Sequence, residues 1–307
     1  MTVLDTSTAR VPPGLAVAPQ LPDLFLPVKI RRGALGFLRN HPTVAIGGVL
    51  LICLVLIGVF APWLGTVDPT AIAPAKRTRV PSADYWFGTD VLGRDIYSRV
   101  IYGARVSLTV GLSVAVLASL AGLAIGLVSG FVRWADGIIM RFMDGLMSIP
   151  PILLAVALMA LTRASVGNVI LAITIAEIPR VSRLVRSVVL SLREQPYVDA
   201  ATASGTRTPM VILRHILPNT LAPMLVQATY ICASAMIVES ILSFIGAGTP
   251  PTIPSWGNIM AEGRALWQVK PYIVFFPAAF LSVTVLAVNL LGDGLRDALD
   301  PRMAKSL

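Results

Sequence analysis

Two glutamates lie inside long apolar stretches of this 307-residue chain, where an ionisable side chain is costly and usually functional. Glu177 could relay protons, bind a substrate group or pair with Arg180, three residues further on, and we favour the ion pair because the site lies close to the membrane interface. Glu239 lies deeper in its apolar run. Two roles remain open for it: lining a polar pathway, or pairing with a basic group on another helix.

Residues that could carry covalent or metal chemistry are scarce. The chain has only two histidines, His41 and His215, and no nucleophile or metal-ligand pattern. Its four lysines follow valine or alanine, so there is no Gly-Lys-Ser/Thr phosphate loop. We therefore expect no enzyme, no intrinsic ATPase, no catalytic or metal-binding residue and no bound cofactor.

The composition indicates a membrane protein, with 55% hydrophobic and only 13% charged residues. Its apolar runs are continuous rather than alternating, which predicts helical spans. We expect an all-α integral membrane protein with about six transmembrane helices. The net charge of +9 is attributed to membrane orientation and lipid headgroups rather than to nucleic acid. The expected spans are 44–64, 105–133, 140–162, 164 to beyond Pro179, 219–246 and 271–292.

The order of these segments predicts a domain organisation. Basic residues are more numerous in the segments that would face the cytoplasm, which places both termini and the polar segment after residue 195 inside. The expected parts are a mostly disordered cytoplasmic tail at 1–40, a first transmembrane helix and external loop at 41–105, a core domain at 106–296 and a cytoplasmic tail at 297–307.

The external loop is expected to carry an amphipathic helix on the outer membrane surface. Leu92, Ile96 and Val100 recur at four-residue spacing, and Asp90 could cap this helix. A cation site at the local aspartates is the weaker alternative, because the calcium-loop spacing is absent. Capping and ion pairing with Arg94 and Arg99 are the favoured roles of the aspartates.

Three further patterns concern helix packing. Gly122, Gly126 and Gly130 recur at four-residue intervals, which lets another helix approach closely. The pair Pro150-Pro151 predicts a kink in the third span. Arg141 and Asp144 are three residues apart and could form an ion pair.

A polar island from Gln195 to Pro223 interrupts the apolar sequence and predicts two short helices set at an angle. Pro196 suits a first helical turn, and Asp199 complements the positive end of that helix. Gly205 can adopt the left-handed conformation that ends it. Thr208-Pro209 predicts a second cap and first turn, and Pro218 is expected to break that second helix.

This island resembles the Glu-Ala-Ala loop of permease subunits of bacterial ABC importers. Asp replaces the usual Glu, and His215 stands where isoleucine is usual; the matching residues are Asp199, Ala200, Ala201, Gly205, Leu217 and Pro218. Three other segments resemble the oligopeptide and dipeptide subfamily: Phe87–Arg105, Pro254–Gly257 and Asn289–Arg302.

The resemblance implies the permease fold of type I ABC importers and a function. The chain would form half of a pathway for di- or oligopeptides in the bacterial inner membrane, with residues 195–218 docking on an ATPase. Its partners would be a second, homologous permease subunit, two ATP-binding subunits that hold the ATP, an extracytoplasmic solute-binding protein and membrane lipid. The alternatives are a permease for nickel or another small solute and, less favoured, a secondary transporter.

Overall fold

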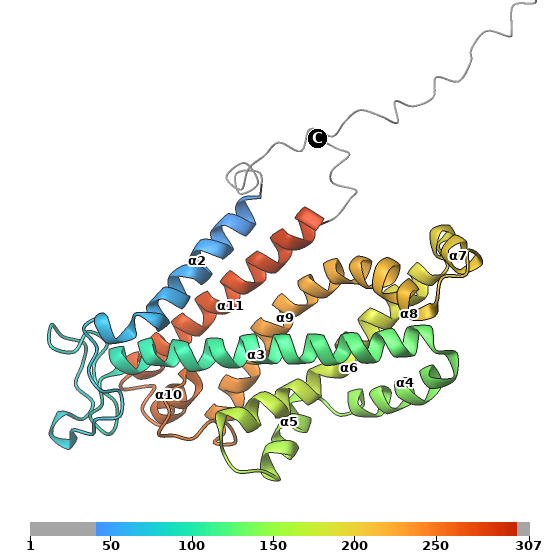
Figure 1. Cartoon of the computed structure of the whole chain (residues 1–307). Helices are drawn as coiled ribbons and strands as arrows, with labels where there is room; N and C mark the ends of the chain where they lie inside the picture. Colours follow the sequence, from blue (N-terminus) through green and yellow to red (C-terminus); the bar gives the residue numbers. More distant parts are fainter. Residues whose placement is uncertain (1–40, 300–307) are drawn as a thin grey trace, which may run out of the picture. The chain divides into compact units, whose positions relative to one another are not determined.

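The computed structural model describes residues 41–299, and the regular structure in this range is helical apart from one isolated bridge between Thr89 and Asp95 (Figure 1). The expected tail at 1–40 and most of the tail at 297–307 lie outside the described residues. The long helices are α2 (Pro42–Val59), α3 (Ile96–Phe131), α6 (Val166–Arg193), α9 (Leu217–Phe244) and α11 (Tyr272–Leu299). The shorter ones are η1 (Ala61–Trp63), η2 (Pro74–Lys76), α4 (Arg133–Met147), α5 (Pro151–Ala160), α7 (Pro196–Ala203), α8 (Thr208–Val211), η3 (Ile212–Ile216) and α10 (Trp256–Gly263).

Length and apolarity identify four or five membrane-spanning helices in the described chain. Four stretches of the described chain are long and apolar enough to cross a bilayer: α2, α3, the segment Thr208–Phe244 and α11. A fifth span results if the bent pair α4–α5 is counted, so six spans are not confirmed. The helix α6 has the length but not the apolarity, because Glu177 and three arginines interrupt it.

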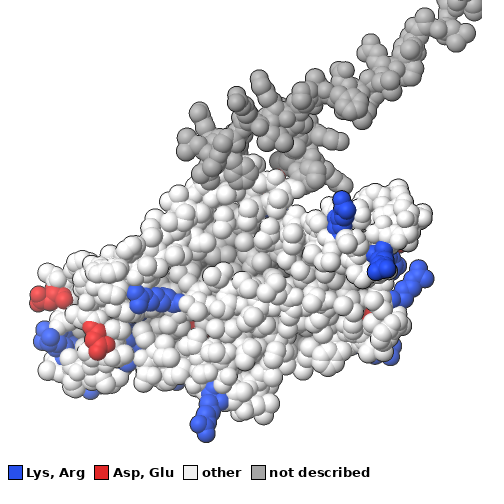
Figure 2. Space-filling view, in the orientation of Figure 1, with Lys and Arg blue, Asp and Glu red and all other residues white. Residues whose placement is uncertain are grey.

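The distribution of charge on the surface agrees with a membrane protein. In Figure 2 most visible charged side chains lie toward the two ends of α3, and a wide, almost uncharged area separates them. Many large apolar side chains in the long helices are exposed, including Leu112 at 63%, Ile52 at 60% and Leu225 at 52%. Such a surface is stable against hydrocarbon and not against water.

The helices α3 and α6 pack closely along a row of glycines. Cβ atoms added to Gly122, Gly126 and Gly130 would lie within 2.4–2.7 Å of the Cβ atoms of Val181, Val185 and Val189. The glycines of α3 and the valines of α6 both recur every four residues. The row of valines therefore fits into a groove along α3 that exists only because glycine has no side chain. The predicted close approach at the glycines is confirmed.

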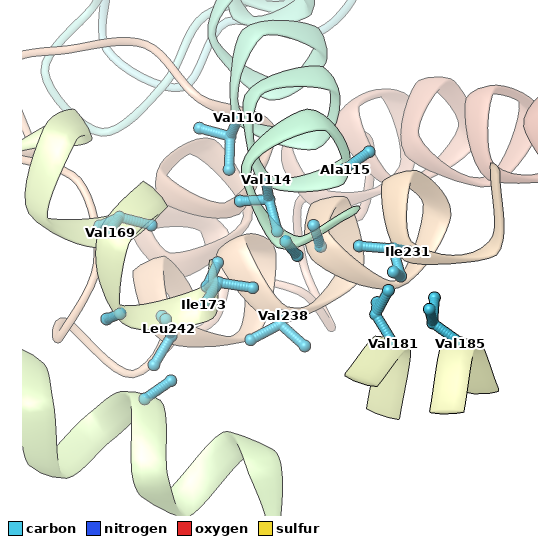
Figure 3. Close-up of a cluster of buried hydrophobic side chains, with 14 of the residues drawn as sticks. Val110, Val114, Ala115, Val169, Ile173, Val181, Val185, Ile231, Val238 and Leu242 are labelled. Carbon is cyan, nitrogen blue, oxygen red and sulfur yellow. The ribbon is translucent and has the colours of Figure 1, made fainter. Parts of the chain in front are cut away.

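The apolar core lies where α3, α6 and α9 meet. Figure 3 shows Val110 and Val114 of α3 facing Ile173 of α6, with Val238 and Leu242 of α9 closing the cluster. All five are buried. This cluster continues along α6 to buried residues of the polar island, so it joins the membrane core to that island.

The predicted kink at Pro150-Pro151 is a complete break between α4 and α5, which are bent by 86°. Two successive prolines remove two backbone donors, and the second restricts the residue before it to extended backbone. The expected ion pair between Arg141 and Asp144 is wrong. Asp144 instead accepts a hydrogen bond at 2.6 Å from Arg183 of α6, since the partner on the neighbouring helix is within reach.

The expected amphipathic surface helix is absent from the described external segment. Residues 85–95 form turns, and α3 starts at Ile96 as part of a continuous helix. Asp95, rather than Asp90, caps α3 by accepting the amide hydrogen of Ser98 at 2.8 Å. The physical reason is that Gly88 and Gly93 take positive φ, at 78° and 77°, and hold the preceding chain in tight turns.

Asp90 is instead the centre of a buried ion cluster. Its Oδ2 lies 2.7 Å from Nε of Arg94 and 2.6 Å from Nη1 of Arg99, and both arginines also pair with Glu262 of α10. Asp90 and Arg99 are almost inaccessible to solvent. The predicted ion pairing is confirmed for Asp90, and the cluster fastens the external segment to α3 and α10.

Candidate functional site

The polar island forms a two-helix projection, residues 195–218, at the end of the long helices opposite the external segment (Figure 1). Pro196 is the first residue of α7, and Asp199 lies in its first turn, as predicted. Gly205 has φ of 81° and ends α7. The amide of Gly205 donates to the carbonyl of Thr202 at 3.0 Å, and the amide of Thr206 donates to that of Ala201 at 3.1 Å, which defines a Schellman motif.

The second helix of the projection differs from the prediction in two ways. Arg207, not Thr208, occupies the N-cap position, and its side chain makes no capping bond. Pro218 does not break the helix, because α8, the π-helical turn η3 and α9 form one continuous stretch from Thr208 to Phe244. The wider π turn places Pro218 in the first turn of α9, where its missing donor is tolerated.

Three buried apolar residues anchor the projection to the protein. Val198 of α7, Val211 of α8 and Ile216 of η3 are at most 2% exposed and join the cluster that contains Val185 and Val189 of α6. The projection is therefore continuous with the membrane core rather than a mobile loop. A force on α7 or α8 would reach α6 and α9 directly.

The outer surface of the projection carries the residues singled out from the sequence. Asp199, Ala200, Gly205 and Pro218 are exposed, and Ala201 and Leu217 are half-buried. Three exposed apolar residues on the same projection were not singled out: Tyr197, Met210 and Leu213 are 43%, 52% and 60% exposed. The sequence could have indicated them, because they are large apolar residues within a polar segment. Such side chains indicate a contact surface when they are not needed for a core. His215 lies beside the ring of Tyr197, with 6.2 Å between ring centroids.

Glu177 forms the ion pair that the sequence predicts. Its Oε2 lies 3.2 Å from Nη1 of Arg180, and its Oε1 accepts a hydrogen bond from Ser234 of α9 at 3.4 Å. The carboxylate is buried, whereas the Arg180 side chain is 38% exposed. The Arg180 guanidinium also lies over the Tyr230 ring, at 5.5 Å from its centroid.

Glu239 is fully buried, and of the two roles left open for it, pairing with a basic group on another helix is not found among the described residues. Its Oε1 accepts a hydrogen bond from Ser243 at 2.8 Å and lies 3.5 Å from the Thr249 hydroxyl. The Thr249 hydroxyl is also bonded to Asn258 of α10 at 2.9 Å. This network of hydroxyl and amide groups replaces the counter-charge and joins α9 to the segment after it and to α10.

These features define a class of protein: a helical membrane subunit with a rigid projection at one end and ionisable groups within its spans. Residues 118–305 match the family described as the binding-protein-dependent transport system inner membrane component, and the chain belongs to this family.

Curated relatives cover nearly the whole chain. A probable peptide ABC transporter permease protein of Sinorhizobium fredii is 55% identical over 86% of this chain and 90% of its own length. The dipeptide transport system permease protein of Alkalihalophilus pseudofirmus is 40% identical, over 93% of this chain and 94% of its own. The oligopeptide transport system permease protein of Bacillus subtilis is 37% identical, over 87% and 88%.

A solved structure shows the same fold. The MetNI methionine ABC transporter in an inward-facing conformation contains a chain that matches with a TM-score of 0.56 and 18% identity, over 66% of this chain and 96% of that chain. The protein is thus a multi-pass membrane component of an ABC importer and works with other subunits of a transporter.

Proposed function

We propose that this chain is the permease subunit of an ATP-driven importer for di- or oligopeptides, forming half of the translocation pathway. The relatives that are 37–55% identical are described as peptide, dipeptide and oligopeptide permeases, which supports this substrate class. The observation that carries the mechanism is the continuity of the projection with α9, from Thr208 to Phe244.

The projection is proposed to dock on an ATP-binding subunit in the cytoplasm. Asp199, Ala200, Ala201 and Gly205 belong to α7 and its end, and Leu217 and Pro218 connect the projection to α9. Two ATP-binding subunits would hold the ATP, and a homologous permease subunit would supply the other half of the pathway. When the ATP-binding subunits close, the anchored projection would tilt α6 and α9 and open the pathway alternately to the two sides.

The proposed orientation places the external segment, residues 60–95, and α10 outside the bacterial cell membrane, and the projection and both chain ends inside. A solute-binding protein would deliver the peptide from outside. Arg193 before α7 and Arg207 and Arg214 after it support this orientation, since basic residues concentrate on the cytoplasmic side of membrane proteins. In this arrangement Glu239 and its hydroxyl network lie toward the outer end of α9.

Reconstitution tests this function. The affinity-tagged chain is purified with the subunits that copurify with it and placed in proteoliposomes containing ATP, with the solute-binding protein and a labelled dipeptide or oligopeptide outside. We expect uptake that requires both ATP and the binding protein, and no ATP hydrolysis by the tagged chain alone. Uptake driven by an ion gradient without ATP, or ATP hydrolysis by the isolated chain, would contradict the proposal.

A further inference from the structure

A strip of polar side chains runs along one face of the membrane helices α6, α9 and α11. The helix α9 lies in its middle, since it packs against both α6 and α11. The strip consists of Glu177 and Arg180 on α6, Gln227 and Tyr230 on α9, and Asn289, Asp293 and Arg296 on α11. Ser234 hydrogen-bonds to Glu177 within it, and a cavity of about 210 Å³ lies between its α9 and α11 members.

Several polar atoms in this strip are buried without a hydrogen-bond partner in the described chain. They are Oε2 of Glu177, Nη1 of Arg180 and Nε2 of Gln227. The first two lie within ion-pair distance of each other but lack hydrogen-bond geometry. A buried polar atom without a partner destabilises the protein, so the strip is incomplete without water or a ligand.

The exposed members of the strip exclude the hydrocarbon part of the lipid as its neighbour. Tyr230 is 53% exposed, the Arg180 side chain is 38% exposed, and Asn289 and Arg296 are exposed as well. Charged and amide groups on spanning helices face a bundle interior or a water-filled cavity, because hydrocarbon cannot solvate them.

The opposite face of α9 provides an internal contrast. Leu225, Ala228 and Cys232 line an apolar groove of about 380 Å³ together with α2, α3 and α11. At 100° per residue, Leu225 and Ser234 point in opposite directions from the helix axis. The contact between Thr229 and Gly292 separates the two faces, since a Cβ on Gly292 would lie 2.2 Å from the Thr229 hydroxyl oxygen. One face of α9 therefore suits hydrocarbon and the other suits water.

We propose that the polar strip lines the water-filled translocation pathway, and that Arg180 contacts the carboxylate of the passing peptide. This inference rests on the proposed function. A guanidinium offers two parallel N–H donors that match a carboxylate, and every unmodified peptide carries one at its C-terminus. Glu177 is a positioning residue, because its buried carboxylate holds the Arg180 guanidinium over the Tyr230 ring while most donors of that guanidinium remain available.

Cysteine accessibility tests the lining. In the complete transporter with Cys53 and Cys232 replaced by alanine, Ser234→Cys is compared with Leu225→Cys, which lies on the same helix and the opposite face. We expect a charged, water-soluble thiol reagent to modify Ser234→Cys at least about tenfold faster. Leu225 is 52% exposed and Ser234 is half-buried, so exposure of the side chain alone would favour the control. Equal rates, or faster modification of Leu225→Cys, would overturn the assignment of the strip to the pathway.

Substrate discrimination tests the role of Arg180. Uptake of a peptide with a free C-terminus and of its C-terminal amide is measured, and each is normalised to wild-type uptake of the same peptide. Arg180→Gln should lower uptake of the free peptide about tenfold or more, the loss of one charged hydrogen bond, and leave the amide within about twofold. Glu177→Gln should shift the ratio in the same direction but less.

Arg183→Gln is the matched control, because Arg183 lies one turn further on α6 and pairs with Asp144. It should affect both peptides equally. Equal losses for the two peptides with Arg180→Gln would mean a structural role and overturn the proposal. Failure of the proposed function is distinguishable, because the wild-type transporter would then take up neither peptide.

Discussion

Gly205 shows at the scale of one residue how the projection depends on backbone conformation. Its φ of 81° is a conformation that side-chain-bearing residues rarely adopt, and an added Cβ would meet no atom within 4 Å. The restriction is therefore conformational and not steric. Replacement costs roughly 1 kcal/mol or more, and a β-branched residue costs most.

We expect Gly205→Val to reduce peptide uptake several-fold in the complete transporter while the chain remains in the membrane. The reason is that the Schellman motif after Ala203 is lost and the docking surface changes shape. Thr206→Val is the control, because it places the same residue, valine, at the next position, where φ is not positive. Uptake and copurification of the ATP-binding subunit are measured at equal membrane abundance.

Normal uptake and association with Gly205→Val would show that the projection is not the coupling element. Asp199→Asn should be milder than Gly205→Val, since a charge at an exposed helix N-terminus contributes less than about 1 kcal/mol.

The sequence predicts residues well where the signal is local. Pro196, Asp199 and Gly205 occupy the positions expected from capping rules, because these rules concern neighbours within one turn. It cannot predict Glu262 as a partner of Arg99, because that contact joins segments 163 residues apart. Tyr197, Met210 and Leu213 could have been found and were not.

At the scale of elements, helix continuity depends on how many prolines occur together. Pro150-Pro151 breaks the chain into α4 and α5, whereas Pro179, Pro223 and Pro277 lie inside helices. A single proline removes one donor, and a helix packed along its length tolerates that. The expected spans continue through Pro179, Pro223 and Pro277, and a break is expected only at Pro218. That expectation was wrong because sequence rules cannot weigh the packing that holds a helix together.

The α3–α6 contact is expected to tolerate no added methyl group. Gly126→Ala places a Cβ 2.6 Å from the Cβ of Val185, so the helices must separate at the cost of about 1–3 kcal/mol. Gly145→Ala in α4 is the control, because nothing lies within 4 Å of its added Cβ. Thermal unfolding of the purified protein in lipid nanodiscs should show a lower midpoint for Gly126→Ala and an unchanged or higher one for Gly145→Ala. A Gly126→Ala protein as stable as the wild type would contradict this packing.

At the scale of the whole molecule, the sequence predicts the class of fold and the apolar spans, whereas its count of about six spans is not confirmed. Counting spans from composition treats each apolar run as independent. The structure shows that α6 carries its charges because neighbours accept them: Arg183 pairs with Asp144, and Arg186 pairs with Asp136. A helix such as α6, whose charges are paired with neighbouring helices, fails a test of apolarity even if it lies in the membrane. A broken pair such as α4–α5 passes that test as one span.

The orientation of the molecule is a further prediction. With Cys53 and Cys232 replaced, an impermeant thiol reagent added to spheroplasts should modify Ser82→Cys in the external segment and leave Ser204→Cys in the projection unmodified. Both positions are exposed, so accessibility alone does not separate them. After permeabilisation both should react, which confirms that each cysteine is reactive. Modification of Ser204→Cys in sealed cells would reverse the orientation.

The π-helical turn at Ile212–Ile216 sets the rotation of the projection around the axis of α9. One residue corresponds to about 100° of rotation around a helix axis, and a π turn contains one residue more than an α-helical turn. Removing a single residue there would restore an ordinary α-helix but swing α7 and α8 around the axis of α9 by that angle. The docking surface would keep its composition and face a different direction. The orientation of this surface around the axis of α9 therefore depends on the number of residues in the turn rather than on their identity.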